Sequence, residues 1–380
     1  MSNKTKIVVF PKLFKTSSIH YLYESIEYFN LKVKNKPTNN HFKTAENSVY
    51  SHRLVPEYFK LNLRHHTLKT KIISEFNWGY SILLNPADSI DSFMNRQFNS
   101  KKRNVLTRYV KRLEICFDIE YKMFYGDIDK SDYNFVMQSL YEMIVARFNQ
   151  RNELHKNLHE WDYLLENTYS EIINKNASLF VIYNKDEPIE VSLNYHFDKV
   201  LFSYLSSYNV DYSKFGLGHV EIYKQIEWCA NNKYILFEMG VGGMDYKRRW
   251  SNNIYRYNHH IVYKNPSFKL NFLIVKIQLK EYLKSKKINE IYPDIRAFFT
   301  KKQKNKVDAV VSEIESINHL TSDNYIKMNQ VATLDNRLKR YINDFLYTSK
   351  NHADDISIYK AKNSYIIKGK DEFQKVSFIK

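Results

Sequence analysis

Hydrophobic and polar residues alternate most regularly between residues 177 and 208. In the segment Ile189–Phe197, "IEVSLNYHF", the Ile, Val, Leu, Tyr and Phe side chains fall on one side and the Glu, Ser, Asn and His side chains on the other. This period of two is typical of a β-strand. Ala177–Tyr183 and Val200–Tyr208 flank the segment across the short turns "NKDEP" and "DK". The pattern therefore predicts three antiparallel strands that follow one another along the chain.

A helical period precedes these strands. Residues 133–150, Leu158–Ile173 and Ser100–Glu114 all repeat apolar residues at helical spacing. In Ser100–Glu114 the apolar positions form one stripe, while basic residues lie off it. The apolar positions are Val105, Leu106, Tyr109, Val110 and Leu113, and the basic ones are Lys101, Arg108, Lys111 and Arg112. The basic face indicates either a contact for phosphates or an ordinary solvated surface.

A loop, a helix and a further strand follow the three strands. The loop Asp211–Gly218 leads into a predicted helix that starts at His219 and carries an apolar stripe. The stripe consists of Ile222, Ile226, Cys229 and Ala230. Tyr234–Gly240 and Ile254–Lys264 have the composition of strands, with a short helix or turn, Tyr246–Trp250, between them. A strand–helix–strand step requires a crossover, so we predict a mixed sheet with a parallel pair.

The two ends of the chain have weaker patterns. Residues 1–99 mix short apolar runs with a predicted helix around residues 18–29. After Pro266 we expect a long helix, more helix over residues 305–350, and a terminal β-hairpin. The expected fold class is α+β, with a mixed, mostly antiparallel sheet flanked by helices. The expected domains are an N-terminal α/β region (1–130), a central domain (131–265) and a helical C-terminal extension with the hairpin (266–380).

The composition gives the net charge of the protein and predicts its compartment. Lys and Arg (58) exceed Asp and Glu (41), and the formal net charge of +17 favours anionic partners or reflects a lysine-rich surface. The two cysteines, Cys116 and Cys229, lie among apolar residues and cannot form a disulfide framework, so we expect a reducing cytoplasm. We expect no signal peptide and no transmembrane segment, because no apolar run is long enough for either.

Glycine is rare in this chain and concentrated in one region. There are eight glycines, and five of them lie between Phe215 and Trp250. Gly216-Leu217-Gly218 stands before a predicted helix, whose first free N–H groups and dipole favour an anion, and glycine would let a phosphate approach the main chain. The motif is neither a Walker loop nor a dinucleotide fingerprint, because Glu221 occupies the place of the third glycine. An ordinary turn before a helix is the alternative.

Further motifs follow the glycine loop in a fixed order. The series is Gly216-Leu217-Gly218, Trp228-Cys229-Ala230, Phe237-Glu238-Met239-Gly240-Val241-Gly242 and Tyr246-Lys247-Arg248-Arg249-Trp250. With these motifs and the basic helix at Lys101–Glu114, the chain resembles the GNAT superfamily of acyl-CoA-dependent acyltransferases, and most closely its CelD-like branch from polysaccharide-biosynthesis loci. The resemblance covers about residues 95–265. It implies a GNAT-type fold, with residues 1–130 as a degenerate first copy of that fold in a tandem arrangement.

The resemblance implies that acetyl-CoA, or another acyl-CoA, is the donor. The residues implied to bind its diphosphate are Lys214, Phe215, Gly216, Leu217, Gly218 and His219. Three departures from the family pattern concern this assignment and the chemistry. Ser213 replaces a long polar residue, Glu238 replaces an aspartate, and Ser251 replaces a glycine.

In the implied reaction an acceptor amine attacks the thioester directly. The protein must remove a proton from the amine, hold the carbonyl oxygen and protonate the leaving thiolate. The candidates are Glu238 and Glu190 as base or substrate-positioning group, Tyr246 as acid, and Lys247, Gly242 and Gly243 as acceptor-binding residues. For Glu190 the alternative is an exposed strand carboxylate. For Tyr246 and Lys247 the alternative is an amphipathic cap that buries Trp250.

No metal site is expected from the histidines. His155 and His159 lie one helical turn apart, but no third ligand accompanies them, so surface histidines are the better interpretation. The adjacent pairs His65-His66 and His259-His260 point apart in either regular structure.

Three functions remain open at this point. The first is an acyl-CoA-dependent N-acyltransferase whose small-molecule acceptor is an amino sugar or another cell-envelope or polysaccharide precursor, phosphorylated or sugar-linked. The second is a Fem-like transferase that uses aminoacyl-tRNA, because the net charge and the basic helix would suit tRNA. The third is a non-catalytic GNAT-like protein that binds a phosphorylated ligand or a partner, which the departure at Ser213 favours.

Overall fold

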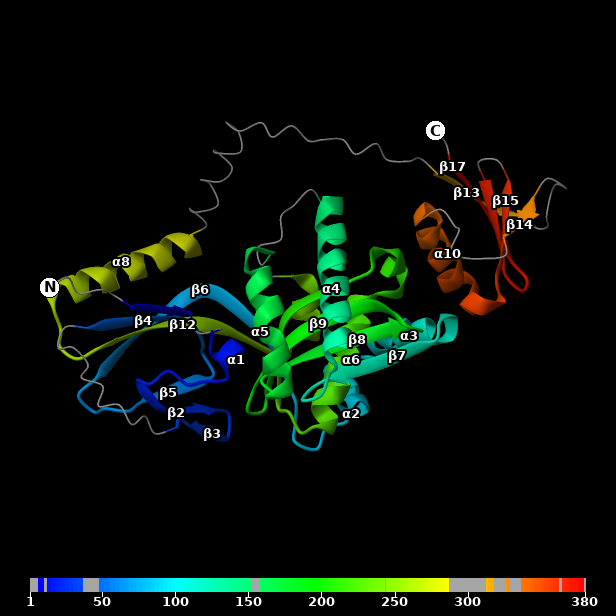
Figure 1. Cartoon of the computed structure of the whole chain (residues 1–380). Coiled ribbons are helices and arrows are strands. Elements are labelled where there is room, and N and C mark those ends of the chain that lie inside the picture. The colour runs from blue at the N-terminus through cyan, green and yellow to red at the C-terminus, as the bar shows by residue number, and fades with distance from the viewer. Residues whose placement is uncertain are drawn as a thin grey trace, which may run out of the picture.

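The largest element of the protein is a nine-stranded mixed sheet with the strand order β1-β4-β12-β6-β11-β10-β9-β8-β7 (Figure 1). The computed structural model describes residues 6–9, 12–36, 48–151, 158–242, 244–286, 312–317, 325–328, 336–361 and 364–378. The strands of the large sheet are β1 (Lys6–Val9), β4 (Val49–Pro56), β6 (Lys69–Leu83), β7 (Ile119–Phe124), β8 (Ala177–Asn184), β9 (Glu187–Phe197), β10 (Val200–Tyr208), β11 (Leu236–Val241) and β12 (Asn253–Tyr263). Together with its helices, this sheet confirms the expected α+β class.

Helices cover both faces of the large sheet. The longer ones in this part are α2 (Ile90–Gln97), α3 (Ser100–Cys116), α4 (Lys130–Arg151), α5 (Trp161–Ile173) and α6 (Leu217–Asn231), and the short ones are α1 (Lys12–Thr16), η1 (Leu158–Glu160), η2 (Val210–Phe215) and α7 (Asp245–Trp250). Alternation along β11 separates the two layers, because Leu236 packs in the core that α4 and α5 share, while Phe237 and Met239 pack in the core of α2 and α6. Among the described helices none combines the length and apolar character needed to cross a bilayer.

The predicted three-stranded arrangement is present at the centre of the fold. β9 pairs antiparallel with both β8 and β10, and β10 pairs in parallel with β11, as the crossover through α6 requires. A second parallel pair, β1 with β4, was not predicted. The polar side of β9 is buried as fully as its apolar side: Glu190, Ser192 and Asn194 are each 0 % exposed. The helices therefore cover the large sheet on both faces here.

The predicted apolar stripes of two helices are confirmed with small corrections. In α3 the stripe is buried at Val110 and Leu113, but Val105 at its start is 38 % exposed. In α6 the predicted stripe is buried apart from Ala230, which is half-buried. The buried face of α6 is wider than predicted, and the added residues are Leu217, Val220, Glu221 and Gln225.

The helix predicted around residues 18–29 is wrong. Tyr23–Tyr28 is strand β2, which pairs with β3 (Leu31–Lys34) and β5 (Phe59–Leu63) in a separate three-stranded sheet. Tyr23, Ile26 and Tyr28 are buried where this sheet packs on the large one. Aromatic and β-branched residues favour such a half-covered pleated surface, and tertiary packing outweighed the helical spacing of the apolar residues.

Strands from both sides of residue 130 form the large sheet. β1, β4 and β6 come from the N-terminal region, and β6 pairs with both β11 and β12. The N-terminal region therefore supplies strands to the same sheet as the central region. The boundaries at residues 130 and 265, and the tandem arrangement, stay predictions.

The C-terminal part contains more strands than expected. The long helix after Pro266 is α8 (Phe268–Ser285), and α10 (Asn336–Ser349) is a second helix. Ser312–Ile317 is a strand, β13, and not part of a helix. The end of the chain contains three strands and not a two-stranded hairpin, so that a five-stranded sheet forms with the order β13-β17-β16-β15-β14. Its remaining elements are β14 (Ile326–Lys327), η4 (Ala353–Asp355), β15 (Ser357–Ala361), β16 (Ser364–Lys368) and β17 (Phe373–Phe378).

The C-terminal sheet and α10 lie at the opposite end of the molecule from α8 (Figure 1). α10 packs against α3 and η2. An Arg112 guanidinium N–H donates to the Tyr347 carbonyl at 2.6 Å, and the Asn343 amide donates to the Asp211 carbonyl at 3.1 Å. The C-terminal part is therefore anchored next to the loop that precedes α6.

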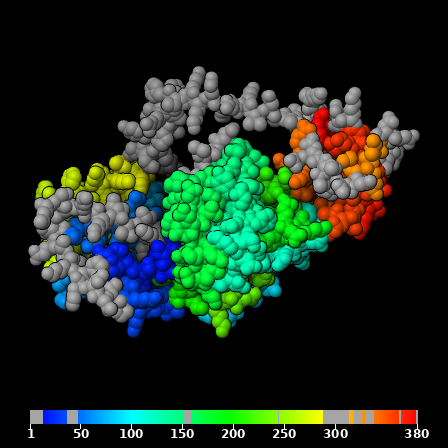
Figure 2. Space-filling model, in the orientation of Figure 1, coloured from blue at the N-terminus to red at the C-terminus, as the bar shows by residue number. Residues whose placement is uncertain are grey.

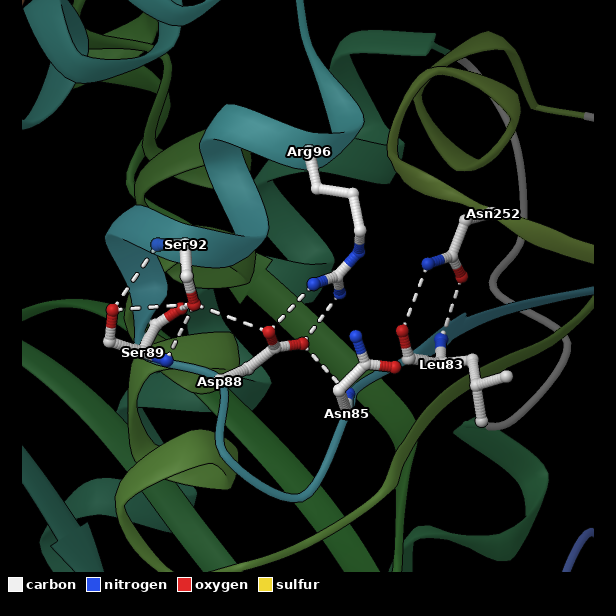
Figure 3. Close-up of polar contacts among 7 residues, drawn as sticks. All are labelled: Leu83, Asn85, Asp88, Ser89, Ser92, Arg96 and Asn252. Carbon is white, nitrogen blue, oxygen red and sulfur yellow. Dashed lines mark hydrogen bonds and ion pairs between the residues drawn. The ribbon is translucent and has the colours of Figure 1, made fainter.

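Polar contacts fix the connection from the centre of the large sheet to α2 (Figure 3). The Ser89 hydroxyl caps the N-terminus of α2, and the Asp88 carboxylate accepts two hydrogen bonds from the Arg96 guanidinium at 2.5 and 2.6 Å. The Asn252 side chain donates to the Leu83 carbonyl at 2.9 Å and accepts from the Leu83 N–H at 2.7 Å. These contacts join the end of β6 both to α2 and to the start of β12.

Candidate functional site

The glycine loop leads directly into the N-terminus of α6. Gly216 has a left-handed backbone (φ 62°, ψ 42°) and precedes Leu217, the first helical residue. This end of the helix has no side-chain cap. The N–H groups of Leu217 and Gly218 therefore meet no capping side chain and lie at the positive end of the helix dipole. A helix start of this kind can accept an anion.

The two glycines of the loop differ in the space that is available for a side chain. A side chain at Gly216 would come within 2.8 Å of the Tyr109 ring from α3, in addition to the strain of a positive φ. The Tyr109 ring also stacks on the His219 imidazole, with ring centroids 5.5 Å apart. A Cβ at Gly218 would meet only the Tyr208 ring at 3.8 Å, which is ordinary contact. A ligand that approaches the main chain would thus be less obstructed at Gly218 than at Gly216.

The other side chains predicted to bind the donor are buried or make polar contacts within the protein. The Lys214 ammonium forms an ion pair with α10 at 3.3 Å, and Phe215 and Leu217 are 0 % and 1 % exposed. The His219 Nδ1 atom accepts a hydrogen bond from the Trp250 indole N–H at 3.0 Å. A diphosphate at this position would therefore contact main-chain N–H groups and not these side chains.

β10 and β11 diverge close to this helix start. They pair only over Val200–Phe202 and Leu236–Glu238. Beyond this point β10 has a bulge between Ser203 and Leu205, and β11 has one between Glu238 and Val241. Strand bulges re-aim side chains and end pairing at such places. The divergence begins at Glu238, one of the predicted catalytic residues.

The Glu238 carboxyl group is enclosed by tyrosines. It is 1 % exposed, and its Oε2 atom accepts a hydrogen bond from the Tyr58 hydroxyl at 2.6 Å. Its Oε1 atom accepts from the Gly240 N–H at 2.6 Å. Burial raises the pKa of Glu238 to about 7, although the Tyr58 hydrogen bond and then the Tyr255 and Gly240 contacts partly oppose the shift. A carboxyl group with this pKa can give up and take back a proton near neutral pH.

The Lys247 side chain extends from α7 to the end of β11. Its ammonium donates to the Met239 carbonyl at 2.6 Å and to the Val241 carbonyl at 3.0 Å. Burial lowers the pKa of this ammonium, and the nearby Glu238 carboxylate partly opposes that shift. Gly242, with φ 125°, has its Cβ position 3.8 Å from the Lys247 nitrogen. The predicted residue Gly243 lies outside the described residues.

A second acidic cluster lies between β9 and α6. The Ser192 hydroxyl lies 2.7 Å from Glu190 Oε1 and 2.8 Å from Glu221 Oε1, and the Gln225 amide donates to Glu221 at 2.9 Å. A serine hydroxyl donates one proton, so a protonated carboxyl group must supply the other hydrogen bond. Burial raises the pKa of Glu221 to about 7 and raises that of Glu190, which the adjacent Glu221 charge raises further. The alternative of an exposed strand carboxylate at Glu190 is therefore wrong.

Tyr246 joins this second cluster from α7. Its side chain is 38 % exposed, and burial of its phenol, followed by the charge of Glu221, raises its pKa to about 12, while Arg147 opposes the shift. The Arg147 guanidinium also lies over the Tyr208 ring, 4.6 Å from its centroid. Trp250, at the end of α7, is 0 % exposed, as the alternative of a packed cap predicted.

The two acidic groups lie on opposite faces of the large sheet. Glu238 points toward Tyr58, while the adjacent Met239 packs with α6, the helix that carries Glu221. α7 adjoins both groups, because Lys247 bonds to β11 and Tyr246 lies near Glu221.

Sequence reasoning missed partners of the predicted residues. Tyr58 lies 180 positions from Glu238, and no local pattern links them. Glu221 could have been found, because it and Gln225 are one helical turn apart on the buried face of α6. Two polar residues at that spacing within an apolar stripe indicate a buried polar cluster.

One group of acidic and histidine side chains in the described ranges has the spacing of metal ligands. It consists of Asp118, His352 and Asp354, whose ligand atoms lie within 4.8 Å of one another. The Lys185 ammonium lies 2.8 Å from Asp354 and 3.6 Å from Asp118, so a cationic side chain already pairs with both carboxylates. His159 is exposed, and His155 lies outside the described residues. The expectation of no metal stays a prediction.

Comparison with known proteins identifies one region of the chain. Residues 100–248 match the family model of the acetyltransferase (GNAT) domain, from the start of α3 into α7. No curated protein matches the sequence. Similar solved structures include L-PGS from Bacillus licheniformis (12% identity, 62% of this chain, 72% of that chain, TM-score 0.38), FemX (9%, 55%, 68%, 0.39) and a GCN5-related N-acetyltransferase from Sphaerobacter thermophilus (10%, 58%, 61%, 0.30).

Proposed function

We propose that this chain is an acyl-CoA-dependent N-acyltransferase with acetyl-CoA as its donor, supported by the match of residues 100–248 to the acetyltransferase (GNAT) domain and by the resemblance of the sequence to the CelD-like branch. The observation that carries the proposal is the uncapped N-terminus of α6 next to the divergence of β10 and β11, where Glu238 is buried. The diphosphate of the donor would take the N–H groups of Leu217 and Gly218. Its thioester would then reach the diverging strands.

Glu238 is suited to accept the proton of the acceptor amine. Its pKa of about 7 leaves it partly ionised near neutral pH. As the amine nitrogen bonds to the thioester carbon, the carbon–sulfur bond breaks and the thiolate leaves. We assign the proton that this thiolate takes to Tyr246, because its pKa of about 12 keeps the phenol protonated. Lys247 and the glycines 242 and 243 remain proposed contacts for the acceptor, and Glu190 a positioning residue.

The proposed acceptor and the proposed compartment have separate grounds. We propose an amino sugar or another cell-envelope or polysaccharide precursor as the acceptor, on the resemblance to the CelD-like branch alone. We propose a cytoplasmic location because Cys116 and Cys229 are both buried free thiols.

A second candidate donor is aminoacyl-tRNA. The outer face of α3 supports it, since Arg108 and Lys111 are exposed and, with Arg112 and Lys350, line a hollow of about 360 Å³ between α3 and the end of α10. A cluster of four cations suits a phosphate backbone, and binding would weaken steeply with salt. A non-catalytic protein that binds a phosphorylated ligand is the third candidate.

Substitution of Gly218 tests the proposed diphosphate site. A side chain at this position meets no atom closer than 3.8 Å, so Gly218→Asp and Gly218→Asn should both fold. The aspartate would itself occupy the helix start and repel a diphosphate, whereas asparagine has the same size without the charge. Thermal unfolding is measured with and without CoA. At 100 times its Kd, CoA should stabilise the unsubstituted protein by about 2.7 kcal/mol and Gly218→Asn by a similar amount, but not Gly218→Asp.

The outcomes separate the candidates. Equal stabilisation of Gly218→Asp and Gly218→Asn by CoA would remove the diphosphate from this helix start. No stabilisation by CoA, combined with salt-sensitive retention of tRNA, would favour the aminoacyl-tRNA donor, and neither response would favour the non-catalytic protein. Amine-dependent thiol release then tests the chemistry: Glu238→Gln should lower it about 100- to 10,000-fold while CoA still stabilises the protein.

A further inference from the structure

Helix α8 has one packed face and one exposed apolar face. The packed face is centred on Leu270, with Ile274 and Ile277, and lies against Ile73 and Ile261 of the large sheet. The exposed face carries five large side chains with spacings of four and three residues. They are Phe268 (87 % exposed), Phe272 (67 %), Val275 (60 %), Leu279 (55 %) and Tyr282 (58 %). We call these five residues the α8 stripe.

Helix α8 lies beside one end of the large sheet (Figure 1) and at the surface of the molecule (Figure 2). A surface helix normally directs its apolar stripe toward the core. Here α8 already fills that contact with a different set of residues, so the α8 stripe is a second apolar face. Contiguous exposed apolar side chains of this size mark docking surfaces.

The charges that flank the α8 stripe are all positive. At about 100° per residue, Lys269, Lys276 and Lys280 follow one edge of the stripe. The other edge carries the uncharged residues Asn271, Gln278 and Ser285. The single acidic residue of α8 is Glu281, which is 8 % exposed, faces the sheet and accepts a hydrogen bond from the Phe76 N–H at 2.7 Å.

This charge pattern argues against a second copy of the chain as the occupant. Paired α8 helices would bring the lysine edge against another lysine edge or against uncharged amides, with no acidic residue to complement it. An anionic lipid surface complements the pattern, because lysine stems extend along the apolar face while the ammonium groups reach phosphates. A formal net charge of +17 adds long-range attraction to such a surface.

We propose that the α8 stripe docks this protein on an anionic phospholipid surface, with α8 lying in the plane of the interface. The stripe would enter the boundary between headgroups and acyl chains, and Lys269, Lys276 and Lys280 would contact lipid phosphates. Docking through α8 would use the face of the large sheet opposite Glu238, because along β12 Arg256 faces the α8 side while the adjacent Tyr255 packs against Tyr58, the hydrogen-bond partner of Glu238. The proposal does not depend on the identity of the acyl donor.

Vesicle flotation tests the proposal with the full chain. Vesicles of phosphatidylcholine with phosphatidylglycerol are compared with vesicles of phosphatidylcholine alone. The variant Phe272→Glu places a charge in the α8 stripe, and Phe135→Glu is its matched control, since Phe135 is 52 % exposed on α4. Both positions are exposed, so both variants should fold, and circular dichroism melting checks this. A second pair replaces Lys269 and Lys276 by Gln on α8, or Lys101 and Lys111 by Gln on α3.

The expected result is binding to the anionic vesicles alone, weakened by salt. Phe272→Glu should lower the partition coefficient at least tenfold, and each α8 lysine removed should lower it about fivefold. Phe135→Glu and the α3 lysine variant should bind within twofold of the unsubstituted protein. Absence of binding, or equal loss in the α8 and α3 lysine variants, overturns the proposal. A dimer in light scattering that Phe272→Glu dissociates would also overturn it, in favour of a second copy.

Discussion

Replacing Glu238 by glutamine should stabilise the protein above neutral pH. The carboxyl group is 1 % exposed and its pKa rises from an ordinary value of 4.5 to about 7 because burial disfavours its charged form. Glutamine has the shape of the protonated acid. Its carbonyl can accept the Gly240 N–H, and its amide can donate to the Tyr58 hydroxyl, which then becomes the acceptor.

The magnitude follows from the two pKa values of Glu238. A raised native pKa means that the native state holds the proton more tightly than the unfolded state, so native stability falls as pH rises from about 4.5 to about 7. Each pH unit in this window is worth about 1.4 kcal/mol, and full ionisation therefore costs about 3 kcal/mol. Glu238→Gln should match the unsubstituted protein near pH 4.5 and exceed its stability by about 3 kcal/mol at pH 8.

Urea unfolding of both proteins between pH 4.5 and pH 8 provides the measurement. Glu190 and Glu221 also have raised pKa values, but they titrate in both proteins and cancel in the difference between them. The reasoning is refuted if the difference in unfolding free energy between the two proteins stays constant over this range. It is also refuted if the advantage of the variant over the unsubstituted protein is smaller at pH 8 than at pH 5.

Three glycine substitutions test the packing around the site. Gly216→Ala should lower the free energy of unfolding by about 1–3 kcal/mol, because φ is positive and the Tyr109 ring lies 2.8 Å from the new Cβ, whereas Gly218→Ala should change it by less than about 1 kcal/mol. Gly79→Ala would overlap the Tyr255 ring and should cost at least about 1–3 kcal/mol. Thermal unfolding measures all three, and equal melting temperatures for the alanine variants at 216 and 218 would contradict the first pair.

The central elements could be predicted because their signals are local. Strict alternation predicted a strand at Ile189–Phe197, which is β9 (Glu187–Phe197) in the structure, and the crossover through α6 required the parallel pairing of β10 with β11. The region Tyr23–Tyr28 shows the limit of such signals, because a helical spacing of apolar residues there was outweighed by burial against the large sheet. The helix predicted at Ser312–Ile317 was wrong for a similar reason, because this segment is a strand that pairs with β17.

The chemistry of the candidate site was only partly visible in the sequence. Glu238 could be singled out because it lies among glycines at the end of a strand. Its enclosure by Tyr58 could not, since that contact joins residues 180 positions apart. The alternative of an exposed carboxylate at Glu190 was wrong because alternation gives the side of a strand on which a residue lies, but not whether a helix covers that side. Helix α6 covers it here and brings Glu221 next to Glu190.

The sequence by itself determined the order of the central strands and helices, the glycine turn before α6 and the residue types available for chemistry, because backbone period and turn conformation depend on near neighbours. The tertiary structure alone decided which carboxyl groups are desolvated, how Tyr109 fills the space above Gly216, and which face of α8 remains exposed. Burial and the pKa values that follow from it depend on residues brought together from distant parts of the chain, and no local pattern specifies them.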